Sequence, residues 1–252
     1  MIPISVTVLT KNSQKYIHSC LEALNAFDEV VLLDNGSIDH TLEIASSFSN
    51  VKIFKCDFAG FGPLKDLAAS YAKNDWILNI DSDEVVTQEL TKEIMQLDLD
   101  NETIYRIRRE NYYNKKIIKC CGWYPDVVLR LYNKHMTSFD KRLVHESLSI
   151  NAGINIIKLE CSIRHFAFDN AAEIIGKMHL YTKLYAAENK GKKTSSPAMA
   201  VLHATFAFMK SYFLQLGFLY GYEGLLISIS NANATFYKYI SLYEENRNCL
   251  RL

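Results

Sequence analysis

The stretch W76-I-L-N-I-D-S-D-E84 decides the fold prediction, because an apolar run typical of a buried strand ends in three carboxylates. A buried carboxylate is costly unless a cation meets it. Residues two apart in an extended chain point the same way, so Asp81 and Asp83 are expected to aim at one point if the strand geometry persists through Ser82. Such an oxygen-rich site suits Mg²⁺ or Mn²⁺. Glu84 is expected to support the turn, and the alternative is a turn in which an aspartate caps the next helix.

Strands and helices alternate on both sides of this stretch through the first hundred residues. The expected strands are 4–10, 29–34, 51–55 and 76–80. The expected helices are 13–24, 39–48, 63–71 and 87–97. Alternation with short links implies parallel βαβ units, and nearly continuous apolar strands suit a sheet that is covered on both faces. The sequence therefore predicts an α/β fold.

The pattern changes after Tyr105. Further strands are expected at 105–109, 114–119, 127–132 and 154–160, separated by turns. From about Asn170 to its end the chain has a helical and aromatic pattern.

Composition narrows the function classes. Lys and Arg number 28, as do Asp and Glu, which argues against a general nucleic-acid binder with a basic footprint. The six cysteines contain no C-x-x-C pair and no zinc spacing, so free thiols of a cytoplasmic protein are expected. The N-terminus lacks the basic region of a signal peptide, and no uncharged apolar run reaches the roughly 18–20 residues that span a bilayer.

The segment D34-N-G-S-I-D39 also follows an apolar strand. Gly36 permits a tight turn, and Asp39 can cap the following helix. Asp34 can accept hydrogen bonds from a nucleobase or a ribose, or it can simply form the turn. A G-x-G-x-x-G motif does not follow the first strand, which makes a nicotinamide-binding fold a weak interpretation.

Several blocks, taken in order, carry a family resemblance. They are T7-V-L-T-K-N12, L33-D-N-G-S-I-D-H-T41, G60-F-G-P-L-K-D-L-A68, W76-I-L-N-I-D-S-D-E84, R106-I-R-R-E-N-Y-Y113, G122-W-Y-P-D126, R130-L-Y132, V144-H-E146 and G217-F-L-Y-G-Y-E-G224. The first four resemble the successive blocks of family 2 glycosyltransferases with the GT-A fold. The later ones resemble the lipopolysaccharide core branch, typified by β-1,4-glucosyltransferases. The last block departs from the family pattern at Tyr220, where an aspartate is expected.

The resemblance implies a fold and an activity. The fold is a GT-A (Rossmann-like) nucleotide-sugar-binding domain with a mixed central sheet and a helical C-terminal extension. Residues 1–168 form the catalytic domain, with 1–100 for the nucleotide sugar and 101–168 on the acceptor side, and 169–252 form the extension. The activity is inverting, metal-dependent transfer of a hexose from a nucleotide sugar, with UDP-hexose favoured, to a lipopolysaccharide core acceptor. The alternatives are a polyprenyl-phosphate or capsule acceptor, or a non-catalytic glycan- or nucleotide-binding relic.

The resemblance also implies roles for individual residues. Donor binding falls to Thr10, Lys11, Asn12, Asp34, Lys65, Asp81 and Arg130. Asp81 and Asp83 form the site for a divalent cation (Mg²⁺ or Mn²⁺) and the diphosphate, with Asp83 as the favoured direct ligand. His165 is either a third metal ligand or a structural histidine. Inversion requires a general base, for which Glu146 beside His145 is preferred to Asp126.

The C-terminal segment has a distinct composition. Residues 206–222 are dense in Phe and Tyr, and five lysines precede them: Lys177, Lys183, Lys190, Lys192 and Lys193. A basic and aromatic segment suits the inner face of an anionic membrane, where a lipid-linked glycan acceptor would lie. The alternative is packing on the catalytic domain, with a homodimer contact.

Overall fold

The structure is a computed structural model, and it describes residues 2–140, 147–150 and 153–249. The chain forms two compact units. The first comprises Met1–Glu110 and Asp126–His165, and the second comprises Asn111–Pro125 and Phe166–Leu252. Residues 111–125 therefore belong to the helical unit, although they precede it by forty residues in the chain.

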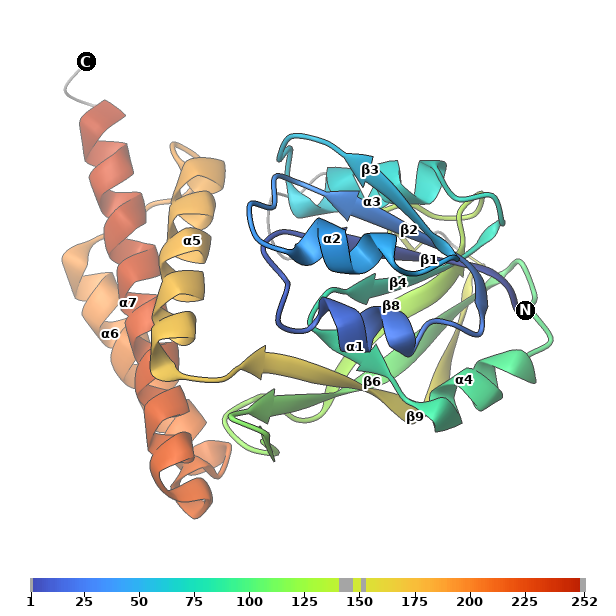
Figure 1. Ribbon diagram of the computed structural model, residues 1–252. Helices are drawn as coiled ribbons and strands as arrows, with labels where there is room; N and C mark the ends of the chain where they lie inside the picture. The colour runs from blue at the N-terminus through green and yellow to red at the C-terminus, as the bar shows by residue number, and fades with distance from the viewer. Residues whose placement is uncertain (1, 141–146, 151–152, 250–252) are drawn as a thin grey trace. The chain divides into compact units, whose positions relative to one another are not determined.

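Nine strands of the described chain form one mixed sheet in the order β3-β2-β1-β4-β8-β6-β9-β5, with β7 paired to β6 (Figure 1). The strands are β1 Ile2–Thr10, β2 Phe27–Asp34, β3 Val51–Lys55, β4 Trp76–Asp81, β5 Glu84–Val86, β6 Thr103–Tyr113, β7 Lys116–Ile117, β8 Asp126–Asn133 and β9 Asn155–Phe168. The strands from β3 to β4 pair in parallel, whereas β8 runs antiparallel to both β4 and β6. The expected α/β fold with a mixed central sheet is confirmed.

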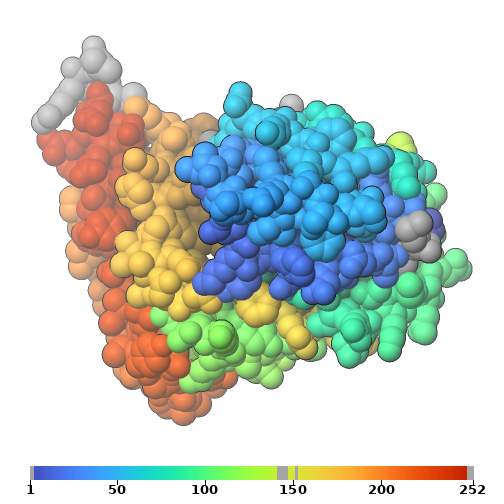
Figure 2. Space-filling view, in the orientation of Figure 1, coloured from blue at the N-terminus to red at the C-terminus, as the bar shows by residue number. Residues whose placement is uncertain are grey.

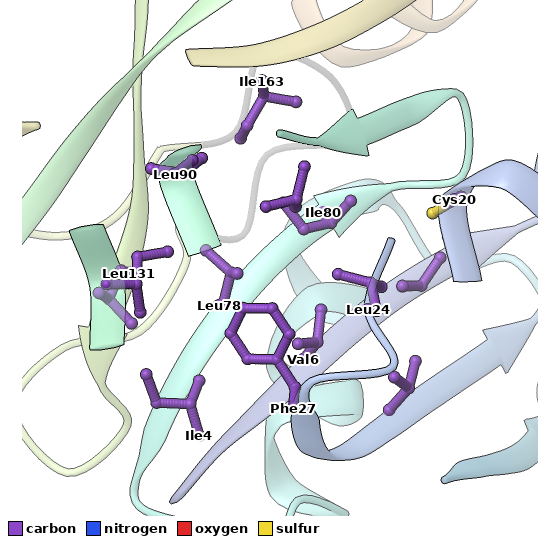
Figure 3. Close-up of a cluster of buried hydrophobic side chains, with 14 of the residues drawn as sticks. Ile4, Val6, Cys20, Leu24, Phe27, Leu78, Ile80, Leu90, Leu131 and Ile163 are labelled. Atoms are coloured by element: carbon purple, nitrogen blue, oxygen red, sulfur yellow. The ribbon is translucent and has the colours of Figure 1, made fainter. Parts of the chain in front are cut away.

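Apolar packing covers both faces of the parallel strands. The helices of this unit are α1 Ile17–Glu22, α2 Thr41–Ser46, α3 Phe61–Ser70 and α4 Gln88–Met95. On one face Leu78 and Ile80 of β4 pack in a core with Cys20 of α1 and Leu90 of α4 (Figure 3). On the other face Ile77 packs with α3 residues. The alternation along β4 therefore turns Asn79 and Asp81 toward the α3 side.

The bounds of several expected elements differ from the structure. The first helix begins at Ile17 and not at Ser13, and residues 14–16 form a turn before it. The strand expected at 114–119 shrinks to β7, because Asn114 and Lys115 adopt positive φ angles of 45° and 65° in a tight turn. The strand expected at 154–160 instead continues to Phe168.

The second unit consists mainly of helices. They are α5 Ala171–Asn189, α6 Pro197–Met209, the π-helical turn η1 Lys210–Leu214, the 3₁₀ turn η2 Gly217–Tyr220 and α7 Gly221–Cys249. A side chain at Gly224 would overlap the backbone oxygen of Gly217, so η2 approaches α7 closely at these two glycines. Within the described residues, none of the helices combines the length and the apolar character needed to cross a membrane.

Candidate active site

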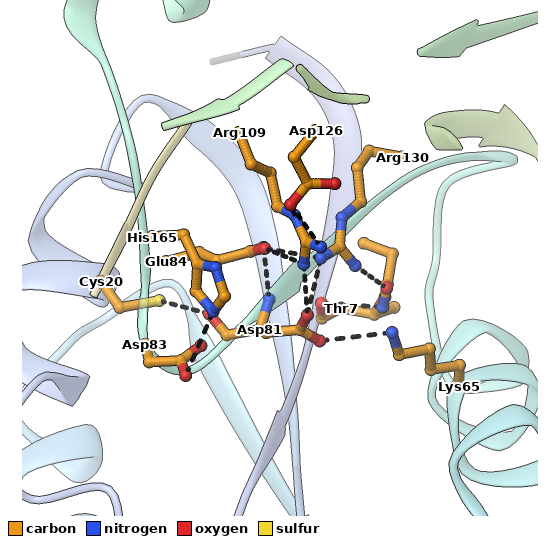
Figure 4. A network of polar contacts seen from close by, with 11 residues as sticks. Thr7, Cys20, Lys65, Asp81, Asp83, Glu84, Arg109, Asp126, Arg130 and His165 are labelled. Atoms are coloured by element: carbon orange, nitrogen blue, oxygen red, sulfur yellow. Dashed lines mark hydrogen bonds and ion pairs between the residues drawn. The ribbon is translucent and has the colours of Figure 1, made fainter. Parts of the chain in front are cut away.

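The turn that follows β4 separates the two aspartates. Ser82 and Asp83 form a two-residue turn before β5 begins at Glu84. The Glu84 carboxylate accepts a hydrogen bond from the backbone N–H of Asp81 at 3.0 Å, as expected of a residue that supports the turn. The extended geometry therefore ends before Ser82, and the condition for Asp81 and Asp83 to point the same way is not met. In Figure 4 their carboxylates reach different partners.

Cations from three other elements meet Asp81, and Arg109 of β6 is the most distant of them, with its Nη1 4.0 Å from Oδ2. Arg130 of β8 donates from Nη2 to Oδ2 of Asp81 at 2.6 Å, and Nζ of Lys65 in α3 lies 3.3 Å from Oδ1 (Figure 4). Burial favours the neutral carboxyl group, but the charges of Arg130 and Lys65 outweigh it and hold the pKa of Asp81 well below its usual range. Asp81 is therefore ionised at neutral pH, and the cations that compensate its charge come from α3, β8 and β6.

Arg130 also bonds to two residues besides Asp81. Its Nη1 donates to Oδ1 of Asn79 at 2.8 Å, and its Nη2 lies 2.6 Å from Oε1 of Glu84. The Arg130 side chain is only 4% exposed. Burial acts against its charge, but Asp81 and Glu84 raise the pKa of Arg130 above its ordinary value. Arg130 thus links the end of β4 to the start of β5.

Arg109 of β6 extends the charged cluster to Asp126. Its Nε and Nη2 lie 2.9 Å and 2.8 Å from Oδ2 of Asp126, and its Nη1 lies 3.3 Å from Oε1 of Glu84. Arg109 and Asp126 stand opposite each other in the β6–β8 register, which brings the pair together. Burial and Arg130 oppose its charge, yet Glu84 and Asp126 raise the pKa of Arg109.

Asp83 and His165 form a second, neighbouring pair. His165 pairs with Glu84 in the β5–β9 register, and its Nε2 lies 3.5 Å from Oδ2 of Asp83. One third of the Asp83 side chain is exposed, against 10% of the His165 side chain. Over the described ranges of the chain, no group of three or more His, Cys, Asp and Glu side chains is arranged to hold a metal ion. The oxygen and imidazole nitrogen that lie together here are nevertheless both ligands that divalent cations take.

The ends of β1 and β2 lie side by side and carry the predicted nucleotide residues. Thr10 pairs with Asp34 in the register. The Asp34 carboxylate accepts hydrogen bonds from the backbone N–H groups of Gly36 and Ser37, so it shapes the turn. Asn12 adopts a φ of 52° and accepts a hydrogen bond from the Ile38 N–H, which joins the two loops.

Two buried oxygens at these strand ends have no hydrogen-bond partner within the described part of the chain. They are the Thr10 hydroxyl and the Asn35 side-chain oxygen. Buried polar groups are normally hydrogen-bonded, so both oxygens suit contact with a polar ligand. Lys11, next to Thr10, is exposed.

Ten of the eleven predicted site residues can be located in the structure. Lys65, Asp81, Arg130 and Asp126 belong to one charged cluster, Asp83 pairs with His165 beside it, and Thr10, Lys11, Asn12 and Asp34 lie at the ends of β1 and β2. Glu146 lies outside the described residues, so its role as the base stays a prediction. The role of Asp126 as the alternative base also stays a prediction. Asp126 is described in the structure and pairs with Arg109.

Arg109 was not identified from the sequence. The feature that places Arg109 in the charged cluster is the opposite charge of Asp126 on a neighbouring antiparallel strand. That signal becomes visible only when the strand register is known. The burial of Glu84 behind the turn was likewise not expected.

A Rossmann-like mixed sheet with a helical C-terminal region is the architecture of the GT-A class of glycosyltransferases. The family model for glycosyl transferase family 2 matches residues 5–156, and the chain therefore belongs to that family. It is 29% identical to an uncharacterized glycosyltransferase of Rickettsia typhi, over 97% of this chain and 88% of that protein. It is 23% identical to the lipopolysaccharide core biosynthesis glycosyltransferase LpsC of Rhizobium meliloti, over 97% of this chain and 93% of LpsC.

A solved structure is also similar. The crystal structure of Staphylococcus aureus TarS 1-349 in complex with UDP matches all of this chain and 92% of its own, with 17% identity and a TM-score of 0.48. Glycosyltransferase activity follows from the family alone.

Proposed function

We propose that the chain is an inverting, metal-dependent hexosyltransferase that uses a nucleotide sugar, a UDP-hexose, and acts on a lipid-linked acceptor of the lipopolysaccharide core. The observation that carries the proposal is the Asp83–His165 pair beside the cation-bound Asp81. The full-length similarity to LpsC supports the choice of acceptor.

Asp83 and His165 would hold the divalent cation. Their chemistry fits, because a carboxylate oxygen and an imidazole nitrogen lie 3.5 Å apart at an edge where Asp83 is partly exposed. Mg²⁺ and Mn²⁺ sites in enzymes commonly use one or two protein side chains and complete their shell with water and substrate phosphate. The bound cation would neutralise charge on the departing diphosphate.

The protein's own residues supply the remaining functions. Thr10 and Asn35 offer unpartnered buried oxygens to the nucleoside, near the strand-end Asp34. Lys65 and Arg130 keep Asp81 ionised and fixed, which holds the β4–β5 turn and with it Asp83. In an inverting transfer the acceptor hydroxyl oxygen bonds to the anomeric carbon as the bond to the diphosphate breaks. A carboxylate base, Glu146 or Asp126, takes the hydroxyl proton.

The decisive variant is Asp83→Ala. It should lose at least about a hundredfold in transfer and should no longer bind Mn²⁺ in a titration of the free protein, because it removes the direct ligand. Asp98→Ala, at an exposed position in the same unit, is the matched control and should retain both properties. Near-normal transfer by a folded Asp83→Ala variant would contradict the metal assignment.

The base is tested separately. Glu146→Gln should keep donor binding, measured by thermal shift with the nucleotide sugar, while losing transfer. If Asp126→Asn behaves in this way instead and Glu146→Gln retains transfer, then Asp126 is the base. An extracted lipopolysaccharide core, compared with polyprenyl phosphate as acceptor, tests the acceptor class in the same assay.

A further inference from the structure

The helix α6 has a composition that normally belongs in an apolar environment. Lys210 is the only residue with a formal charge from Pro197 to Tyr222, so α6 itself carries none. A helix that is apolar around its whole circumference is usually buried in a protein core or in a membrane. Most of α6 is exposed in this structure. An apolar helix with an exposed surface requires an apolar partner.

The exposed apolar residues follow one side of the helix. Leu202, Phe206, Met209 and Phe213 are spaced by four, three and four residues and are 71%, 62%, 49% and 48% exposed. This spacing places them in one stripe, while Ala200 and Ser211 on other positions are buried. Leu214 and Leu219 continue the exposed apolar surface into η1 and η2 at 75% and 63%. We call these six residues the apolar stripe.

Aromatic contacts connect the stripe to the turns that follow it. The Tyr212 ring contacts Phe208, Phe213 and Phe218, at centroid distances of 5.4, 5.1 and 6.4 Å. Figure 2 shows side chains of the C-terminal part of the chain, in orange, on the surface of the helical unit. The Tyr212 ring contacts the stripe at Phe213.

The charge of the helical unit selects the partner. Within residues 111–125 and 166–252 the sequence has 12 Lys and Arg against 6 Asp and Glu, and thus a net charge of +6 in a chain that is neutral overall. The acidic residues of this unit are Asp169, Glu173, Glu188, Glu223, Glu244 and Glu245. A second copy docked through the same face would bring two such positive units together. An anionic surface is attracted to the unit instead.

The helix α6 is too short to span a membrane. The 13 residues of α6 extend about 20 Å, against the roughly 30 Å of a bilayer's hydrocarbon core. A short apolar helix bordered by lysine and aromatic side chains lies in the interface between headgroups and acyl chains. We infer that the apolar stripe of α6, η1 and η2 docks this protein on an anionic lipid membrane, with Lys210, the first residue of η1, near the headgroups. This surface goes beyond the proposed transfer reaction and is independent of its donor and acceptor.

Flotation of the full chain with vesicles tests the inference without substrate. Wild-type protein should float with vesicles of phosphatidylcholine that contain phosphatidylglycerol, and much less with phosphatidylcholine alone. Leu202→Ser, Phe206→Ser and Phe213→Ser combined should lower the bound fraction at least about fivefold. Lys210→Gln should weaken binding to the anionic vesicles only. Met95→Ser, at a 54% exposed position in α4, is the matched control and should float like wild type.

Two results would overturn the inference. Wild-type protein could fail to float with anionic vesicles, or the triple variant could float as well as wild type with an unchanged thermal melt. If wild type does not float and light scattering without lipid shows a dimer that the triple variant loses, the stripe belongs to the interface with a second copy. The flotation assay contains no sugar donor, so a loss of flotation does not contradict the proposed transfer reaction. Conversely, protein that floats but shows no transfer activity does not contradict membrane docking.

Discussion

Among single residues, Arg130 has the largest structural role in the charged cluster. Its guanidinium bonds to Asn79, Asp81 and Glu84 and is almost fully buried. Removing one partner of a buried ion pair leaves the other charge uncompensated in a region of low dielectric. The sequence alone suggested that Arg130 binds diphosphate, and this stays a prediction. The geometry adds that Arg130 holds the strand ends together.

We therefore expect Arg130→Leu to lower the free energy of unfolding by about 3–5 kcal/mol, because Asp81 and Glu84 lose their shared cation. Arg106→Leu, at an exposed position in β6, should change it by less than about 0.5 kcal/mol. Urea denaturation of the three proteins measures both values. Equal stability of the two variants would show that the buried cluster contributes little.

The depressed pKa of Asp81 predicts a dependence of stability on pH. The unfolded chain binds the Asp81 proton near its ordinary pKa of about 3.9, above the folded value, so the contribution is complete at higher pH and is lost as pH falls through the folded pKa. Between about pH 4 and 2, wild type should lose stability more steeply than Asp81→Asn. Asp98→Asn should keep the wild-type slope. Parallel profiles for wild type and Asp81→Asn would contradict the assignment.

Among elements, the parallel strands could be predicted because their apolar runs are nearly continuous, and β3 was placed with its observed bounds. The separation of Asp81 from Asp83 could not be predicted, because it depends on whether Ser82 stays extended, and long-range contacts decide this. Glu84 bonds to the Asp81 N–H, and Ser82 pairs with Ser13 sixty-nine residues away at 2.7 Å. Pairs such as Arg109 with Asp126 require a register that local pattern does not contain.

The contact between η2 and α7 gives an element-scale prediction. Gly224→Ala should lower the free energy of unfolding by about 1–3 kcal/mol, because the new methyl group meets the backbone oxygen of Gly217. Gly176→Ala in α5 has open space around it and should raise the free energy by about 0.5–1 kcal/mol. Thermal melts should thus shift in opposite directions. A shift of the same sign for both would contradict the close approach of η2 to α7.

At the scale of the whole molecule, the formal net charge is zero, but the two units have net charges of opposite sign. The sequence composition predicted a chain without a basic footprint, and that holds for the sum. Only the division of the chain, in which 111–125 joins the helical unit, makes the +6 charge visible. Assigning 111–125 to the catalytic part was natural from chain order, because contiguous segments are the usual expectation for a domain.

This charge separation predicts association that depends on salt. Near its pI of about 7.0 the chain has no net repulsion, so at low ionic strength the positive unit of one copy should attract the negative unit of another. Static light scattering should show a mass that rises with protein concentration in dilute buffer. Physiological salt, with a Debye length of about 8 Å, should restore a constant mass. A mass that does not change with salt would contradict this.

The two-residue link between β4 and β5 has a consequence for insertions and deletions. Glu84 and Val86 are buried and Val85 lies between them, so the strand alternates immediately after the link. Deleting one residue of the link would shift that alternation by one position and place Val85 where the Arg130 guanidinium needs the Glu84 carboxylate. The length of the link is therefore fixed by the side-chain alternation of the strand that follows it.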